Sequence, residues 1–373
     1  MFEKIFKLKA NDSNVRTEIV AGLTTFMTMA YIIALDPNLL TNFDTGSALW
    51  NGVFMATCVA SAIGMFCMAF LANKPIAMAP GMGLNSFFAV VVGNIVGLTG
   101  MSYLASFQAA LIIILIEGIV FIILSIFNIR DKIVESIPLG IRRGSSPAIG
   151  LMLMNIGLGS NAGIYSENGG PFFVMRDFFG ALTPSVAQGA MGSGYGPMIL
   201  TVVTMFVGLF AIVSLAKKGV KGAVLIGMLI ASVIHWGGSF IFLHTNPFAA
   251  LAGASFLPPV KDMIDTTFFK FNFAGLVEIG WFTVITLTIT FCIIDMFDTI
   301  GTLAGTASRA GMVDEQGNMP NMKEALLSDA VGTVVGACTG TSTVTTFVES
   351  ASGVEAGGRT GLTALTTGVL FLA

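Results

Sequence analysis

The chain alternates long apolar segments with short polar connections. A helix needs about 20 predominantly apolar residues to cross the hydrocarbon core of a bilayer. Segments of this kind occupy residues 17–35, 52–71, 76–98, 104–127, 198–216, 223–243 and 273–303, and shorter apolar runs occupy residues 148–158, 329–337 and 361–373. This pattern predicts an all-α polytopic membrane protein, and the last run predicts a sequence that ends inside a helix.

The composition excludes most soluble classes. Charged residues make up only 10% of the 373 residues, hydrophobic ones make up 54%, and the mean hydropathy is +0.86. A soluble domain of this size could not cover its surface with so few charges. A net charge of −3 provides no basic excess for nucleic acid. The lipid bilayer is therefore an expected partner and nucleic acid is not.

The basic residues orient the chain. If the N-terminus is cytoplasmic and every segment crosses, only Arg176, Lys261 and Lys270 lie outside, with Arg359 unassigned. The others lie inside: Lys4, Lys7, Lys9, Arg16, Lys74, Arg130, Lys132, Arg142, Arg143, Lys217, Lys218, Lys221, Arg309 and Lys323. Because cytoplasmic loops are enriched in Lys and Arg, this predicts a cytoplasmic N-terminus. We expect the membrane to be a plasma or inner membrane.

Two further segments lie outside the apolar ones. Residues 1–10 interleave lysine with Phe, Ile and Leu, which is typical of a short interfacial helix, although a signal peptide is the alternative. Residues 161–197 are rich in Gly, Pro and Ser, which favours an external loop.

The four cysteines lack CxxC spacing, and His235 and His244 lack a second ligand at helical spacing. The sequence thus predicts no disulfide, metal site or cofactor.

Two apolar segments are interrupted. Residues 75–88 contain two prolines and two glycines before a helix can begin near Leu84. Residues 340–353 are rich in Thr, Ser and Val, which favours a strand, with a helix expected from about Glu349. Interrupted helices in two matching halves mark the binding site of many transporters. Asn85 and Glu349 are 264 residues apart. Adding 264 to Thr17, where the first apolar segment begins, gives position 281, inside the segment 273–303, so the spacing supports a repeat. The alternative is that the two interrupted segments are ordinary kinked helices.

Acidic residues occur where hydrocarbon disfavours them. Asp295 and Asp298 lie in an apolar segment, and their i,i+3 spacing puts both on one helical face. Glu349 lies in the second interruption, and Glu117 lies alone in residues 104–127. Intramembrane acids commonly serve proton relays and substrate sites. The alternative is a structural role satisfied by hydroxyl donors such as Thr343, and for Glu117 we favour that alternative.

Four motifs resemble a known family. They are AGLTTFMTMAYI at residues 21–32, APGMGLN at 79–85, DMFDTIGT at 295–302, and GTSTVTTFVES at 340–350 with GGRTGL at 357–362. Together they are similar to AzgA-like adenine/guanine/hypoxanthine permeases of the xanthine–uracil permease superfamily. Asp36 departs from the resemblance, since related sequences commonly have Asn before this proline.

The resemblance implies a seven-plus-seven inverted-repeat fold, with short strands in the third and tenth segments and an end after the eleventh. It implies a cytoplasmic segment (1–16), a core domain (17–128 and 273–373) and a gate domain with external loops (129–272). Substrate contacts are expected from Asn85, Asp295, Glu349, Gly83 and Thr343, and proton coupling from Asp298, Asp295 and Glu349.

We therefore expect proton-coupled symport of purine nucleobases, with no cofactor and with a homodimer left open. One alternative is another solute on the same fold, such as xanthine, uracil or an anion, although central acids would repel an anion. A second alternative is an intramembrane aspartyl enzyme, but two aspartates on one helical face clamp a substrate poorly. A channel would have no use for coupled carboxylates.

Overall fold

The computed structural model describes residues 2–42, 44–127, 178–185, 195–220, 222–249, 257–309, 311–312 and 319–373, with a few isolated positions between 129 and 158. The chain forms two compact units, Met1–Ser146 with Pro258–Ala373, and Pro147–Leu257. The predicted segment at residues 148–158 and most of the predicted loop at residues 161–197 lie outside the described residues.

The first apolar segment is not one continuous helix. A short helix α1 (Phe2–Phe6) and a 3-10 turn η1 (Lys9–Asn11) precede α2 (Val15–Met29), which begins where the Asn14 side chain accepts from the Thr17 amide at 3.0 Å. After Ala30 and Tyr31 the chain continues as α3 (Ile32–Leu40). Pro37 lies inside α3; it has no N–H, and its ring crowds the carbonyl one turn earlier. Four residues before Pro37 is Ile33, and there the chain makes i→i+3 bonds, from Ile33 N to Ala30 O and from Ala34 N to Tyr31 O, both at 3.2 Å.

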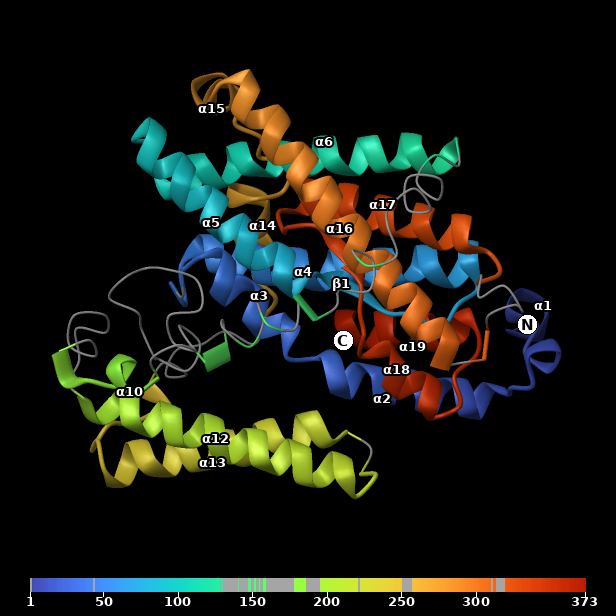
Figure 1. Ribbon diagram of the computed structural model, residues 1–373, viewed down its shortest axis with the longest axis horizontal. Helices are drawn as coiled ribbons and strands as arrows, with labels where there is room; N and C mark the ends of the chain where they lie inside the picture. Colours follow the sequence, from blue (N-terminus) through green and yellow to red (C-terminus); the bar gives the residue numbers. More distant parts are fainter. Residues whose placement is uncertain are drawn as a thin grey trace. The chain divides into compact units, whose positions relative to one another are not determined.

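The two predicted interruptions are present. After α4 (Ala48–Cys67) and the π-turn η2 (Met68–Ala72), the chain forms strand β1 (Met78–Pro80) and then helix α5 (Met82–Thr99). In the second half, strand β2 (Val344–Thr346) precedes the short helix α18 (Ser350–Glu355). The helix after β1 begins two residues before Leu84, and Glu349 is the N-cap of α18. Figure 1 shows β1 and its neighbours amid the helices of this unit.

The remaining helices of this unit include one more interruption. They are α6 (Tyr103–Ile126), α14 (Val260–Thr266), α15 (Phe273–Ile279), α16 (Trp281–Arg309), α17 (Met322–Thr339) and α19 (Gly361–Leu372). We expected one segment over residues 273–303, but Gly280 has a φ of 87°, which favours glycine, and it separates α15 from α16. Helix α16 begins at Trp281, the position that the 264-residue spacing gives.

Helix α17 is longer than its apolar run, residues 329–337, because an amphipathic turn with Lys323 and Glu324 precedes that run. It packs against α4 and α6, and α19 packs against α2 and α4. These pairings bring elements from the two ends of the sequence side by side, as the adjacent α2 and α19 show in Figure 1. The strands lie within this layered packing, where β1 contacts α4 and β2 contacts α16 and α17.

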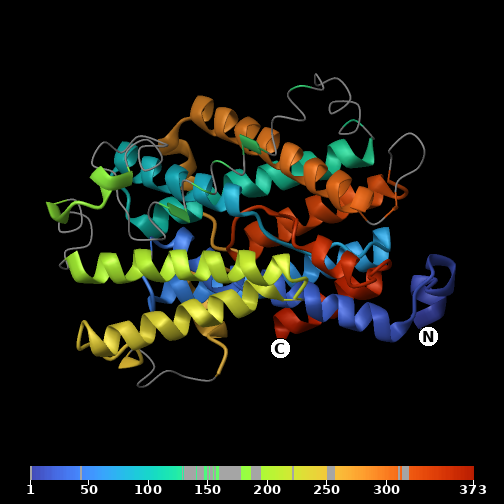
Figure 2. The same cartoon turned by 60° about the horizontal axis from the view of Figure 1, so that its bottom comes forward.

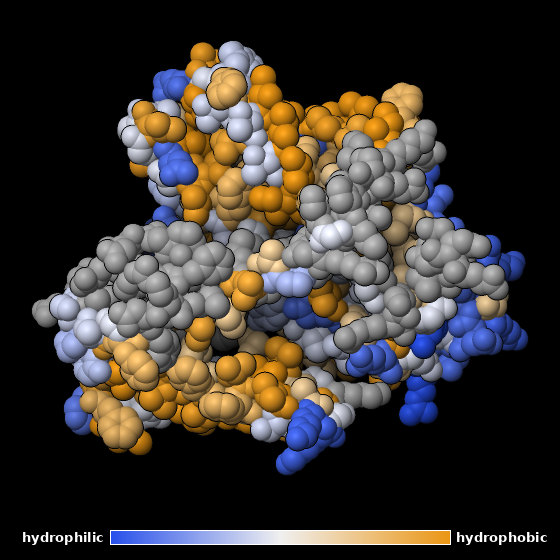
Figure 3. All heavy atoms as spheres, in the orientation of Figure 1, coloured by the Kyte–Doolittle hydropathy of each residue, from blue (hydrophilic) through white to orange (hydrophobic). Residues whose placement is uncertain are grey.

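The second unit contains α10 (Phe178–Ala181) and the hairpin of α12 (Tyr195–Lys217) and α13 (Ala223–Ile241). Figures 1 and 2 show α12 and α13 side by side. Their outward faces carry exposed apolar side chains such as Phe210 and Val233. Figure 3 shows this apolar surface, and it shows hydrophilic residues gathered at the N-terminal segment. Within the described residues, seven helices are long and apolar enough to cross a membrane.

Candidate functional site

The two interruptions form one small antiparallel sheet. Met78 pairs with Thr346, Ala79 with Thr345 and Pro80 with Val344. All six residues are buried. One further backbone bond extends the ladder at each end, from Gly81 N to Thr343 O and from Phe347 N to Ala77 O, both at 3.0 Å. Because the strands are antiparallel, α5 and α18 begin at opposite ends of the pair.

The close approach of the strands depends on glycine at one position. A Cβ at Gly81 would lie 2.7 Å from Thr345 Cγ2. The same Cβ would lie 3.5 Å from Asp298 Oδ2, which places this carboxylate beside the end of β1. Gly83, which we expected among the substrate contacts, lies buried in the first turn of α5. Gly81 is therefore the glycine that the strand contact requires.

Glu349 lies beside Tyr31, which stands between α2 and α3. The Tyr31 hydroxyl donates to Glu349 Oε1 at 2.6 Å, and Thr28 donates to the Glu349 carbonyl at 3.5 Å. Asp298 interacts electrostatically with both Glu349 and Asp329. Unlike the fully buried Asp295, Glu349 and Asp298 keep part of their side chains accessible. The structure thus brings two of the predicted acids, Asp298 and Glu349, close enough to interact beside the strand pair.

The buried aspartate Asp295 belongs to a hydroxyl-centred cluster. The Thr299 hydroxyl lies 3.1 Å from Asp295 Oδ1, 3.1 Å from Asp329 Oδ1 and 2.7 Å from the Thr345 hydroxyl. These groups come from α16, α17 and β2, and all four are buried. A threonine hydroxyl has one proton to donate, so it cannot donate to both carboxylates at once. The hydroxyl therefore serves at most one of the two aspartates at a time.

Asn85 and Thr343 make contacts near the start of β2. The Ser342 hydroxyl donates to Asn85 Oδ1, and Asn85 Nδ2 donates to the Pro80 carbonyl at 3.4 Å. The Thr343 hydroxyl donates to Glu117 Oε2 at 2.7 Å. Asn85 is thus joined to the second interruption through Ser342, whereas the Thr343 hydroxyl faces Glu117. A structural role for Glu117 is in keeping with this contact.

Sequence reasoning missed Tyr31 and Asp329. Asp329 is the first residue of a short apolar run, and a charged residue in that position is normally taken as the end of the membrane-spanning segment. Only the apolar Ala325 and Leu326 before it indicate that the helix begins earlier. Tyr31 carried no chemical signal, because its partner is 318 residues away. Within the described residues, no group of three or more His, Cys, Asp and Glu side chains could hold a metal ion.

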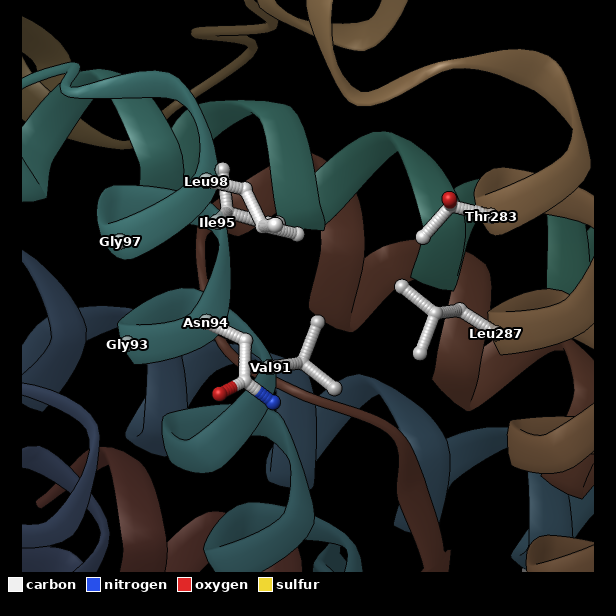
Figure 4. Close-up of a pocket in the computed structure, with 8 residues that line it drawn as sticks. All are labelled: Val91, Gly93, Asn94, Ile95, Gly97, Leu98, Thr283 and Leu287. Atoms are coloured by element: carbon white, nitrogen blue, oxygen red, sulfur yellow. The ribbon is translucent and has the colours of Figure 1, made fainter.

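A cavity of about 410 Å³ lies elsewhere, between α5 and α16. Figure 4 shows the residues that line it, and they include none of the expected site residues: Val91, Gly93, Asn94, Ile95, Gly97, Leu98, Thr283 and Leu287. None of these residues is charged, and the Asn94 amide and Thr283 hydroxyl are its polar side chains. This cavity is a poor match for a site built on acids.

Comparison with known proteins identifies the family. A family model described as a permease family matches residues 16–373. The chain belongs to the xanthine–uracil permease family. It is 36% identical to the adenine permease AdeP of Escherichia coli K12 over 375 residues, which cover 100% of this chain and 74% of AdeP. It is 38% identical to the guanine/hypoxanthine permease PbuO of Bacillus subtilis 168 over 373 residues, which cover 99% of this chain and 76% of PbuO.

Solved structures confirm the fold of this permease-family chain. The transmembrane domain of a cyanobacterial bicarbonate transporter, BicA, superimposes with a TM-score of 0.60 at 16% identity, covering 96% of this chain and 82% of that domain. SLC26A9 gives a TM-score of 0.53 at 11% identity, covering 96% of this chain and 53% of the other. These proteins share the seven-plus-seven inverted-repeat fold, so that prediction is confirmed. Family membership also confirms a transporter rather than an intramembrane enzyme.

Proposed function

We propose that the protein is a proton-coupled symporter of purine nucleobases, taking up adenine, guanine or hypoxanthine across the plasma or inner membrane. The observation that carries this proposal is the pair of acids, Asp298 and Glu349, at a strand pair formed from two interrupted helices. Relatives named as adenine permease and guanine/hypoxanthine permease support the substrate class. The distribution of basic residues supports a cytoplasmic N-terminus.

The proposed site suits a purine because purines present N–H donors and ring acceptors on flat edges. A carboxylate accepts N–H groups, and an asparagine amide both donates and accepts. We assign substrate contacts to Asn85, Asp295, Glu349 and Thr343, with Gly83 allowing the backbone to approach. Glu349 has one oxygen held by Tyr31 at 2.6 Å, which supports a fixed orientation of the other. Asp295 and Thr343 contact the substrate in this scheme only after exchanging their present partners.

Proton coupling is assigned to Asp298, Asp295 and Glu349. Adjacent carboxylates in a low dielectric repel each other when both are charged, so a proton on one stabilises the group. The electrostatic contact of Asp298 with Glu349 supports this role, because a proton there changes the charge that the substrate meets. Loading a proton then biases the core between outward-facing and inward-facing states.

The domain scheme completes the proposal. We infer a core domain from residues 17–128 and 273–373, which contain every proposed site residue, and a gate domain from residues 129–272. The compact unit of Met1–Ser146 with Pro258–Ala373 supports this division, although it takes in residues 129–146 and 258–272 as well. A homodimer is compatible with this scheme but plays no part in it.

Uptake of radiolabelled adenine, guanine and hypoxanthine by cells expressing the full-length protein, with and without a proton gradient, tests the function. We expect uptake of at least one purine and its loss when a protonophore collapses the gradient. Gradient-independent uptake would contradict the coupling. Competition by unlabelled uracil, xanthine or bicarbonate tests the alternative of another solute on the same fold. Displacement of the labelled purine by adenine, guanine or hypoxanthine but not by these three competitors would exclude it.

A further inference from the structure

Another carboxylate of the core, Asp36, is fully buried and plays no part in the site described above. It lies on α3, one residue before Pro37. Its Oδ2 atom lies 2.5 Å from the Thr57 hydroxyl on α4 and 2.7 Å from the Thr341 hydroxyl, which directly precedes Ser342. Its Oδ1 atom has no hydrogen-bond partner among the described residues.

The proton count around Thr57 indicates the charge state of Asp36. The Thr57 hydroxyl also lies 2.7 Å from the Val53 carbonyl, which can only accept. One hydroxyl proton cannot serve both acceptors. If Thr57 donates to Val53, the short contact with Asp36 needs a proton on Asp36. If Thr57 instead donates to Asp36, a carboxylate is buried with one oxygen unsatisfied, which is costly in a low dielectric.

Helix α3, which carries Asp36, contacts the second interruption at two places. At one end, Tyr31 holds Glu349, which follows β2; in the middle, Asp36 holds Thr341, which precedes β2. Tyr31 and α3 therefore form hydrogen bonds to the second interruption both before and after β2. Ser342, next to Thr341, donates to Asn85. A shift of α3 would move both sides of the strand and the Asn85 contact together.

Few other ionisable groups face Asp36. Helix α3 packs against α4, α5 and β1, and α5 and β1 carry no Asp, Glu, His, Lys, Arg, Cys or Tyr. On α4, Cys58 interacts with the Asp36 carboxylate. Tyr103 of α6 donates to the Leu40 carbonyl at the far end of α3, and Tyr31 lies at its beginning. Among the described residues of these elements, no cation lies opposite Asp36 to stabilise its ionised form.

We propose that Asp36 is a proton-binding positioning residue, protonated in this conformation, whose ionisation favours a displaced α3 and thereby alters the second interruption. Ionisation places a charge on a carboxylate that has one oxygen without a donor. The ionised form therefore favours a conformation in which α3 moves and Oδ1 gains a donor, and proton release is linked to that movement. Asp36 would then be a second proton site in the proposed symport. The protonation of Asp36 does not depend on the proposed function, whereas its effect on transport does.

The protonation itself is tested without any transport assay. Infrared difference spectra of the purified protein at neutral pH compare Asp36→Asn with wild type, because a protonated carboxyl has its own C=O band. We expect Asp36→Asn to remove one such band, and Asp44→Asn, a control at an exposed aspartate, to remove none. Identical carboxyl bands in wild type and Asp36→Asn would overturn the proposal. Thr57→Val, which removes the hydroxyl that Asp36 contacts, should shift the frequency of the same band; an unshifted band would count against the contact.

The transport consequence is tested by the pH profile of purine uptake in the full-length protein. Asparagine retains the size of the side chain and can donate to both hydroxyls, so uptake at acid pH should stay within about two-fold of wild type. Uptake should then fall less steeply towards alkaline pH. An unchanged pH profile would overturn the coupling role, since a purely structural Asp36 would not alter it. If wild type takes up no purine, the proposed function fails while the infrared result still decides the protonation.

Discussion

The Tyr31 hydroxyl donates to Glu349 Oε1 at 2.6 Å and joins residues that are 318 positions apart. Tyr31 is the N-cap of α3, and Glu349 is the N-cap of α18. The bond therefore ties the first interrupted helix of the sequence to the helix that follows β2. It holds one oxygen of the carboxylate that we assign to the substrate.

Removing this hydroxyl should weaken purine binding. A hydrogen bond to a charged group contributes about 1.5–3 kcal/mol, so Tyr31→Phe should raise the dissociation constant about ten-fold or more. Isothermal titration of the purified protein with hypoxanthine, guanine and adenine measures it. Tyr103→Phe is the matched control, because the Tyr103 hydroxyl donates to the Leu40 carbonyl away from Glu349. Equal affinities in Tyr31→Phe and wild type would show that the bond does not orient Glu349 for binding.

The Thr299 hydroxyl should matter for proton coupling. It lies between Asp295 and Asp329, at 3.1 Å from each, so Thr299→Val leaves the two carboxylates without their shared donor. We expect Thr299→Val to lower proton-driven purine uptake several-fold and Thr299→Ser, which keeps the hydroxyl, to retain it. The measurement is the ratio of uptake with and without a proton gradient. An equal ratio in both variants would remove this hydroxyl from the coupling scheme.

Gly81 should tolerate no side chain. A Cβ there would lie 2.7 Å from Thr345 Cγ2, so Gly81→Ala should destabilise the protein by about 1–3 kcal/mol, seen as a lower midpoint of thermal unfolding in detergent. Gly93→Ala is the control, since a Cβ at Gly93 meets no atom within 4 Å. The double variant Gly81→Ala/Thr345→Ser, which removes the Cγ2 atom, should recover most of the loss. Failure to recover would mean that the clash lies elsewhere.

The interruptions and their acids were predictable from sequence because their signals are local. Prolines and glycines before Leu84 disfavour a helix there, and β-branched residues before Glu349 favour a strand. Asp295 and Asp298 stood out because hydrocarbon disfavours charge. The break at Tyr31 was not predicted, because its Ala30-Tyr31 sequence is compatible with a helix. The contacts of Tyr31 with Glu349 and of Thr299 with Asp329 depend on tertiary packing, which no local pattern encodes.

Glu18 has a structural task that the sequence did not reveal. This buried carboxylate of α2 lies at the start of α19, where its two oxygens accept from the Arg359 amide at 2.9 Å and the Thr360 amide at 3.2 Å. It also accepts from the Ser13 hydroxyl at 2.6 Å and the Thr363 hydroxyl at 2.5 Å. A carboxylate at a helix N-terminus satisfies free N–H groups and the helix dipole.

Glu18→Ala should therefore lower stability without entering the transport chemistry. It leaves these donors without their acceptor in a buried position, which costs at least about 2 kcal/mol. Thermal unfolding in detergent measures the loss, and Glu3→Ala, at an exposed glutamate, is the control. Protein that remains folded should bind purine with wild-type affinity. Unchanged stability would show that α19 does not depend on this cap.

The most direct test of the central claim is purine uptake by full-length Glu349→Gln and Asp298→Asn, compared with the exposed-site control Asp44→Asn at equal amounts in the membrane. Each amide keeps the size of its acid but removes the negative charge and the ability to exchange a proton. We expect uptake below about a tenth of wild type in both variants, since a charge-assisted hydrogen bond contributes about 1.5–3 kcal/mol, and unchanged uptake in Asp44→Asn. Wild-type uptake in both Glu349→Gln and Asp298→Asn would contradict the assignment of these acids to the purine and proton site.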